Sequence, residues 1–192
     1  MVIGHSSDQE TATRFESTVL LHLDAAYNLA RWLSRDDHSA EDIVQIAIMR
    51  AFKFFDGFRG EDARAWLLTI VRNTYFTSLR DDQRGEGEVS FDEEFHDRDG
   101  ADQNSSAYNI ANNPEDILAE RDVKRQVTKA LESLPPQFRE VLVLKEIEGM
   151  SYKEIAGIVG IPLGTVMSRL ARGRELLRKY LKAHAEGDIF GL

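Results

Sequence analysis

The sequence of 192 residues contains no cysteine, only four prolines and no long run of apolar residues. Without cysteine the chain has no disulfide framework, thiolate nucleophile, zinc ribbon or thiol-based redox sensor of its own. No apolar stretch approaches the roughly 20 residues that span a bilayer. The first residues, MVIGHSSDQETATRF, lack the basic start and apolar stretch of an export signal. These absences predict a cytoplasmic protein with no membrane insertion.

Catalytic and metal-binding patterns are also missing from the sequence. The five histidines are scattered without metal-ligand spacing, and there is no nucleophile motif or phosphate-cradling glycine loop. We therefore expect no enzymatic activity, catalytic residue, metal site or cofactor. The hydrophobic content of 42% is nevertheless enough to bury a core.

Charge is distributed unevenly along the chain, whose formal net charge is -9. Residues 81–122 hold 14 acidic and 3 basic residues, whereas residues 123–192 hold 12 basic and 8 acidic residues. The acidic stretch also collects Gly, Ser and Asn without sustained periodicity, which is typical of a flexible linker. A linker over 81–113 reaches roughly 110 Å when extended and averages about 30 Å as a coil. Two domains could therefore lie far apart.

Apolar residues recur at helical spacing on both sides of this linker. On the N-terminal side they predict three amphipathic helices, with breaks at 34–39 and 56–61 and a helix start at Glu61 or Asp62. No strand pattern competes, so we expect an all-α fold of two small helical domains. The expected parts are a disordered N-terminus (1–12), a helical domain (13–80), the acidic flexible linker (81–113), a four-helix domain (114–183) and a C-terminal tail (184–192).

Within the C-terminal domain, the stretch SYKEIAGIVGIPLGTVMSRLARGRELLRKY predicts a helix-turn-helix. Ser151 and Glu154 form a capping-box pattern that starts the first helix. Gly160 suits the left-handed residue that ends this helix, Pro162 suits the start of the next, and Thr165 falls in its first turn. The segment at 114–134 and a helix over 137–147, separated by two prolines, precede this motif.

The second helix of the motif is strongly basic. Its small or polar first turns are followed by a series of arginines, which can donate two hydrogen bonds to guanine or bind phosphates in a DNA major groove. A solvated surface helix is the alternative for any basic amphipathic segment. The capped first helix and the turn in front of it favour DNA binding.

Two stretches resemble the extracytoplasmic-function (ECF) group of bacterial RNA polymerase sigma factors, within the sigma-70 family. SAEDIVQIAIMRAFKFFDGFRGEDARAWLLTIVRNTYFTSLR at 39–80 is similar to region two of the family. SLPPQFREVLVLKEIEGMSYKEIAGIVGIPLGTVMSRLARGRELLRKYL at 133–181 is similar to its region four. The resemblance implies a sigma factor that binds core RNA polymerase, directs it to specific promoters and helps to melt promoter DNA.

The resemblance also implies which residues of region two make contacts. The AEDIVQ helix would dock on polymerase through Asp42, Gln45 and Arg50, although Asp42 could simply stabilise a helix N-terminus. The loop before the tryptophan-containing helix, which includes Gly60, and the helix itself would capture an extruded base. This role falls to Phe58, Arg59 and Asn73, with Arg72 and Arg80 on nearby phosphates. Phe58 also continues an apolar stripe, so ordinary core packing remains its alternative.

In region four the resemblance assigns the upstream promoter contacts. The predicted DNA-binding residues there are Lys145, Thr165, Ser168, Arg169 and Arg172. The resemblance further implies an anti-sigma factor as a partner. The acidic linker would lie in a basic channel of the polymerase, and a plain solubilising tether is its equal alternative.

A stand-alone helix-turn-helix regulator is the other function that the sequence leaves open. Such a protein would share the C-terminal domain but would bind duplex DNA tightly, usually as a symmetric dimer, without polymerase. A sigma factor is instead expected to bind free DNA weakly and to depend on the core enzyme.

Overall fold

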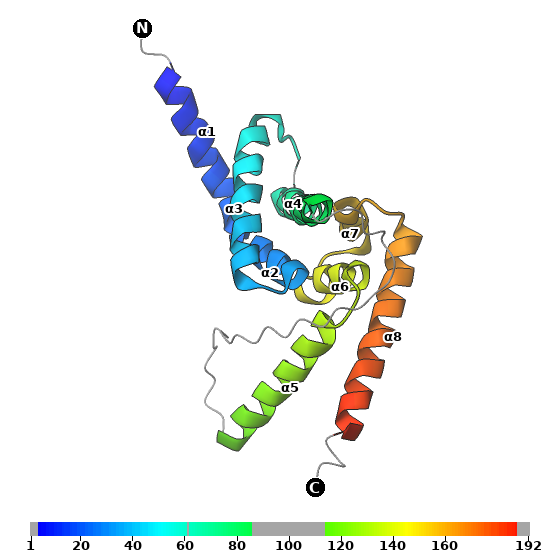
Figure 1. Ribbon diagram of the computed structural model, residues 1–192. Coiled ribbons are helices and arrows are strands. Elements are labelled where there is room, and N and C mark those ends of the chain that lie inside the picture. The colour runs from blue at the N-terminus through cyan, green and yellow to red at the C-terminus, as the bar shows by residue number, and fades with distance from the viewer. Residues whose placement is uncertain (1–3, 61, 86–113, 188–192) are drawn as a thin grey trace.

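The computed structural model describes residues 4–60, 62–85 and 114–187, and all of their regular elements are helices (Figure 1). We call the elements up to residue 85 the N-terminal half and those from residue 114 the C-terminal half. Most of the predicted linker, residues 86–113, and the end of the predicted tail, residues 188–192, lie outside the described residues. The all-α prediction is confirmed.

The first predicted helix is divided in the structure. Its parts are α1 (Gly4–Thr18), the short 3-10 helix η1 (Leu20–His22) and α2 (Leu23–Ser34). Because a 3-10 turn holds fewer residues than an α-turn, η1 changes the phase of the buried stripe. Regular helical spacing from Phe15 and Val19 would bury Leu23, yet Leu23 is 41% exposed and Ala25 is buried instead. The helix also extends back to Gly4, whereas a disordered N-terminus was expected over 1–12.

The next two helices of the N-terminal half begin at side-chain caps. α2 ends at Arg35, whose φ of 61° is left-handed. Asp36 then accepts a hydrogen bond from the backbone N–H of Ser39 at 2.7 Å and caps α3 (Asp37–Phe54). After the 3-10 helix η2 (Phe55–Gly57), Asp62 accepts from the N–H of Ala65 at 2.9 Å and starts α4 (Ala63–Gly85). The predicted break and the start at Asp62 are therefore confirmed.

The C-terminal half has four α-helices, and one of them ends in a π-helix. α5 (Pro114–Glu132) is separated by the two prolines from α6 (Pro136–Leu142), which continues as the π-helix η3 (Val143–Ile147). α7 (Tyr152–Val159) and α8 (Leu163–Gly187) follow. The predicted helix over 137–147 is thus present, but its last part is wider than an α-helix, and nothing in the sequence pattern indicated this.

The two halves pack against each other rather than standing apart. α4 lies beside α7, and α2 lies beside α6, near the centre of the molecule (Figure 1). Buried apolar residues of both halves form one continuous cluster, which includes Leu33 and Leu68 of the N-terminal half and Val141 and Ile155 of the C-terminal half. The two predicted helical domains are therefore in contact, and their described residues share one continuous hydrophobic core.

Candidate nucleic-acid interface

The helix-turn-helix is built by the local signals that the sequence carries. The hydroxyl of Ser151 accepts from the N–H of Glu154 at 3.2 Å, while the Glu154 carboxylate accepts from the N–H of Ser151 at 2.6 Å. This reciprocal capping lowers the pKa of Glu154, chiefly through its side-chain hydrogen bond with Ser151. Gly160 ends α7 in the left-handed conformation with φ 72°. Across this turn the chain changes direction by 100°, an angle typical of a DNA-binding helix-turn-helix.

The exposed face of α8 carries some of the predicted DNA contacts. Ser168 and Arg172 are exposed, and Thr165 is partly buried in the first turn. Arg172 pairs with Glu175 at 2.8 Å, a solvent-exposed pair that DNA phosphates can readily replace. The half-exposed Met167 stands between these side chains in sequence and adds an apolar contact surface.

Lys145 lies in the π-helix η3, ahead of the helix-turn-helix. Its Nζ donates to the carbonyl oxygen of Met150 at 3.2 Å and lies 5.1 Å from the centre of the Tyr152 ring. The side chain is therefore oriented by the segment that leads into α7.

Arg169 does not share the exposed face with Ser168 and Arg172. Its Nη1 lies 3.3 Å from Oε1 of Glu140 on α6, and its side chain is 27% exposed. Glu140 also accepts from Arg72 of α4, through Nε at 2.8 Å and Nη2 at 3.4 Å. Two of the predicted DNA-binding arginines, one from each half, thus converge on one carboxylate.

Burial determines the electrostatics of this cluster. The side chain of Glu140 is only 1% exposed, and desolvation raises its pKa above the ordinary value, although Arg72 and Arg169 act in the opposite direction. Arg139 beside it is also buried, and desolvation lowers its pKa to about 10. Arg139 donates to the main-chain carbonyls of Glu132 at 2.7 Å and of Leu33 at 3.4 Å.

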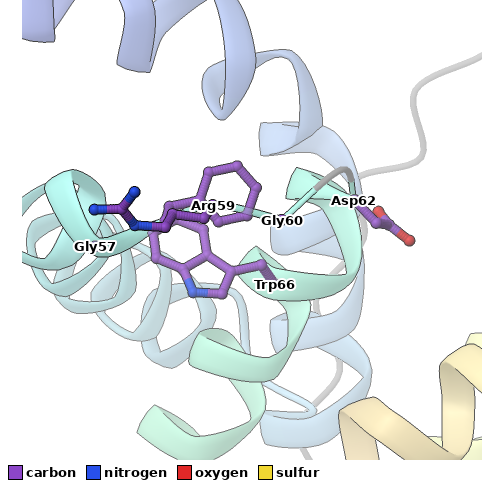
Figure 2. A pocket seen from close by; sticks show the side chains of 6 residues that line it. Gly57, Arg59, Gly60, Asp62 and Trp66 are labelled. Atoms are coloured by element: carbon purple, nitrogen blue, oxygen red, sulfur yellow. The ribbon is translucent and has the colours of Figure 1, made fainter.

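In the N-terminal half, the predicted base-capturing loop borders a shallow hollow. The hollow has a volume of about 670 Å³ and is lined by Gly57, Phe58, Arg59, Gly60, Asp62 and Trp66. In Figure 2 Arg59 and Trp66 lie together on one side of it, while Asp62 points away from them. The hollow is large enough to receive a planar ring, and its wall is partly aromatic.

Phe58 is packed as well as accessible. Its ring centre lies 4.7 Å from that of Trp66 and 6.1 Å from that of Phe55, and it stacks nearly parallel to Phe55. Its side chain is partly buried, and the ring also lines the hollow. This geometry is compatible with both interpretations of Phe58, as a base-stacking ring and as part of the core.

The remaining predicted contacts of this half lie along α4. Asn73 and Arg80 are both exposed, and Phe76 lies between them in the sequence. Arg72, the neighbour of Asn73, lies with its guanidinium 4.6 Å above the Phe76 ring and points toward Glu140. The side chain of Asn73 therefore faces solvent, whereas that of Arg72 lies in the contact between the two halves.

The predicted polymerase-binding residues lie on the outer face of α3. Asp42, Gln45 and Arg50 are all exposed, and Arg50 donates to the hydroxyl of Thr74 on α4 at 3.3 Å. Ile46 and Met49, exposed by 40% and 67%, share this face, although the sequence assigned neither of them a contact. Their helical spacing could have predicted this exposure, because the inward positions 43, 44, 47 and 51 leave Ile46 and Met49 on the opposite side of the helix.

Two further features are absent from the described part of the chain. Among those residues no group of three or more His, Asp or Glu side chains could hold a metal ion. No single described helix is long and apolar enough to cross a membrane, and the pair α7 and α8 meets that criterion only when taken together across its sharp bend.

Comparison with known proteins gives the same two regions. Residues 18–85 match the family model for sigma-70 region 2, and residues 124–177 match that for sigma-70 region 4. The chain is 35% identical over 184 residues to the ECF RNA polymerase sigma factor SigE of Mycolicibacterium smegmatis, covering 96% of this chain and 68% of that one. It is 34% identical to the ECF RNA polymerase sigma-E factor of Escherichia coli, covering 71% and 70%.

Solved structures with the same arrangement are also known. The sigma factor RpoE of Bartonella quintana, solved in complex with the anti-sigma factor NepR, superposes with a TM-score of 0.69 and 30% identity. The match covers 88% of this chain and 97% of that one. CnrH in complex with the cytosolic domain of CnrY gives a TM-score of 0.60 at 26% identity, covering 90% of each chain.

Proposed function

The chain belongs to the ECF group of the sigma-70 family and is a sigma factor, and we propose that its two halves divide promoter recognition between them. The N-terminal half would dock on core RNA polymerase and capture an unpaired base, and the C-terminal half would read the upstream promoter element. The observation that carries this proposal is that one chain holds both a region-2 match and a region-4 match.

Polymerase docking is assigned to the outer face of α3. Asp42, Gln45 and Arg50 supply polar groups there, and Ile46 and Met49 add apolar area that no other described element covers. A mixed face of exposed apolar and polar side chains is the usual composition of a protein-protein contact. Docking through α3 leaves the hollow beside Trp66 and the exposed face of α8 free for DNA.

Promoter opening is assigned to the hollow and to the exposed side of α4. Phe58 supplies a ring on which an extruded base can stack, Asn73 supplies an amide that can read the edge of that base, and Arg59 and Arg80 supply phosphate contacts. The phosphodiester chemistry itself would belong to the polymerase, so the chain acts without catalysis of its own and in the cytoplasm, where transcription occurs.

Upstream recognition is assigned to α8 and Lys145. Arg172 and Ser168 can reach base edges from the exposed face, Thr165 and Lys145 can hold the adjoining phosphates, and Arg169 joins them once it is released from Glu140. We further propose an anti-sigma partner. The solved relative RpoE is bound to the anti-sigma factor NepR, and CnrH is bound to the cytosolic domain of CnrY.

Run-off transcription with purified core polymerase and genomic DNA fragments tests the proposal. A sigma factor yields promoter-specific transcripts only when the chain and core polymerase are both present. A stand-alone regulator would instead bind a duplex fragment tightly without polymerase and would leave core polymerase inactive on every fragment.

A further inference from the structure

Methionine supplies all of the sulfur in this chain, which has four methionines and no cysteine. A thiolate reacts readily with oxidants, so an exposed cysteine usually shields the other side chains of a protein. No such group is present here. A methionine thioether is oxidised to the sulfoxide, and methionine sulfoxide reductases reverse the reaction. An oxidant that reaches this protein therefore acts on whichever methionines face solvent.

The three methionines of the described residues differ sharply in exposure, and Met1 lies outside those residues. Met49 on α3 is 67% exposed and Met167 on α8 is 52% exposed. Met150, in the segment before α7, is only 2% exposed and packs in the hydrophobic cluster of the two halves. Two thioethers are therefore open to an oxidant in solution, and the third is a protected reference within the same chain.

Met49 lies at the centre of an exposed apolar strip on α3. Ile46 is three positions before it and Phe52 three positions after it, and both are exposed. Residues three apart lie on the same side of a helix, so the three side chains form one surface. Met49 also lies one turn beyond Gln45, within the proposed docking face. Docking through this face would bury its thioether.

Met167 has the same arrangement on α8. Leu163, four positions before it, and Ala171, four positions after it, are both exposed. Ser168 directly follows Met167, and Arg172 directly follows Ala171, so this second strip borders the proposed base contacts. The helices α3 and α8 lie on different sides of the molecule (Figure 1). A change at one of the two thioethers therefore acts on one proposed contact surface and leaves the other as it was.

We propose that Met49 and Met167 are sites of reversible oxidation, through which peroxides lower the activity of the free sigma factor. The effect on transcription rests on the proposed function, whereas the oxidation itself does not. In the reaction the sulfur lone pair forms an S–O bond with one oxygen of hydrogen peroxide and the O–O bond breaks. The other oxygen leaves as water, with both hydrogens. Sulfur loses two electrons and the peroxide gains them, and a reductase using a dithiol reverses the change.

The sulfoxide opposes docking because it places a strong hydrogen-bond acceptor in the middle of an apolar strip. Water hydrates this oxygen in the free protein, and a partner that covers the strip removes the water. Burial of a polar group without a new hydrogen bond is unfavourable, so we expect about tenfold weaker binding at each surface. Oxidation of Met49 acts on core polymerase binding, and oxidation of Met167 acts on promoter binding.

Peptide mass mapping of the free, folded protein tests the choice of sites. The protein is treated with hydrogen peroxide at neutral pH, and the gain of one oxygen atom is followed at each methionine. We expect Met49 and Met167 to react roughly tenfold faster than Met150, and all three to react at similar rates in urea. Circular dichroism checks that the treated protein keeps its helices. Equal rates at the three positions of the folded protein would overturn the proposal.

Binding to core polymerase tests the effect of Met49. The variants are Met49→Leu, Met167→Leu and the double variant, because leucine keeps an apolar side chain of similar volume without sulfur. Peroxide is removed before polymerase is added, and each treated protein is compared with its own untreated sample. Wild type and Met167→Leu should lose about tenfold in affinity, and treatment with the reductase should restore it. Met49→Leu should show no loss, and a loss equal to that of wild type would overturn the role of Met49.

Promoter binding by the assembled holoenzyme tests the effect of Met167. Met49→Leu isolates this site, so its treated form should bind a promoter fragment about tenfold more weakly than its untreated form. The treated double variant should match its untreated form. Equal losses in the two proteins would overturn the role of Met167. Failure of the untreated wild type in run-off transcription would count against the proposed function alone, because the mass mapping contains neither polymerase nor DNA.

Discussion

Gly173 of α8 lies directly against Leu142 of α6. A Cβ atom added to Gly173 would stand 2.9 Å from Cδ1 and 3.3 Å from Cγ of Leu142, and 3.4 Å from Cβ of Phe138. The absence of a side chain therefore allows α8 to approach α6 closely, and this approach fixes the helix that carries Arg169 and Arg172 onto the rest of the C-terminal half.

Replacing this glycine should weaken the packing of the proposed recognition helix. Gly173→Ala places a methyl group into a fully buried position, so we expect a loss of roughly 1–3 kcal/mol of unfolding free energy. The matched control is Gly157→Ala in α7, where nothing lies within 4 Å of the added Cβ. That change should stabilise by about 0.5–1 kcal/mol through helix propensity. Urea unfolding measures both, and equal effects would contradict the close approach.

Arg172→Ala should lower promoter-dependent transcription while binding to core polymerase is retained. Loss of a base contact costs roughly 1–3 kcal/mol, and the exposed partner Glu175 is not left buried when the arginine is removed. Arg178→Ala, an exposed arginine farther along α8, is the control and should have a smaller effect. Transcription at limiting promoter concentration is the measurement. A wild-type rate for Arg172→Ala would show that the residue does not read the promoter.

Asp42→Arg combined with Gln45→Ala should reduce affinity for core polymerase without unfolding the protein. Both side chains are exposed on α3, so their replacement leaves the core intact and reverses one charge on the proposed docking face. A pull-down with core polymerase measures the affinity, and circular dichroism checks the fold. The single change Glu41→Arg, at a neighbouring exposed position, controls for added positive charge. Undiminished binding by the double variant would remove α3 as the docking face.

Phe58→Ala and Asn73→Ala should impair promoter melting while closed complexes still form. Loss of stacking on Phe58 costs roughly 1–3 kcal/mol, and neither change touches the contacts of α8 with duplex DNA. Permanganate footprinting of unpaired thymines detects melting, and a gel shift detects closed complexes. A template mismatched around the start site should restore part of the activity, more fully for Asn73→Ala if stacking on Phe58 persists.

Thermal unfolding separates the two interpretations of Phe58. Its ring packs on Trp66 and Phe55, so a purely structural role predicts that Phe58→Ala loses stability and closed complexes together. A base-stacking role predicts that melting of DNA fails in a protein that remains well folded. Normal opening of duplex promoters by both variants would refute base capture.

The stability of the protein should depend on pH through Glu140. Burial raises its pKa above the ordinary 4.5, so the folded protein holds this proton more tightly than the unfolded chain does. The contribution of protonated Glu140 to the free energy of unfolding is present at low pH and is lost as pH rises through the raised pKa. Urea unfolding from about pH 4.5 to about pH 7.5 should therefore show wild type losing stability relative to Glu140→Gln. A constant difference, or a slope of opposite sign, would contradict the raised pKa.

Local signals in the sequence predicted the helices whose ends are marked by capping residues or a left-handed glycine. The capping box at Ser151 and Glu154, the left-handed Gly160 and the cap at Asp62 all lie where the pattern placed them. Each depends on residues within four positions of one another, and a single sequence contains that information in full. The departures at η1 and η3 occur where the backbone changes its helical pitch without a proline or glycine to mark the change.

No local signal in the sequence predicted the contact between the two halves. Arg72 and Glu140 are separated by 68 positions, and Arg64 and Glu148 by 84. Along their own segments these residues appear as ordinary charges between apolar positions, and only the packing of α4 on α7 and of α2 on α6 turns them inward. The resemblance therefore indicated Arg72 and Arg169 as candidate DNA contacts, whereas their shared partner Glu140 could be found only from the structure.

The hydrophobic cluster that the two halves share also affects how the protein unfolds. Because Leu33 and Leu68 pack in the same cluster as Val141 and Ile155, loss of one half exposes apolar surface of the other. The described residues should therefore lose their structure in one cooperative transition rather than in two.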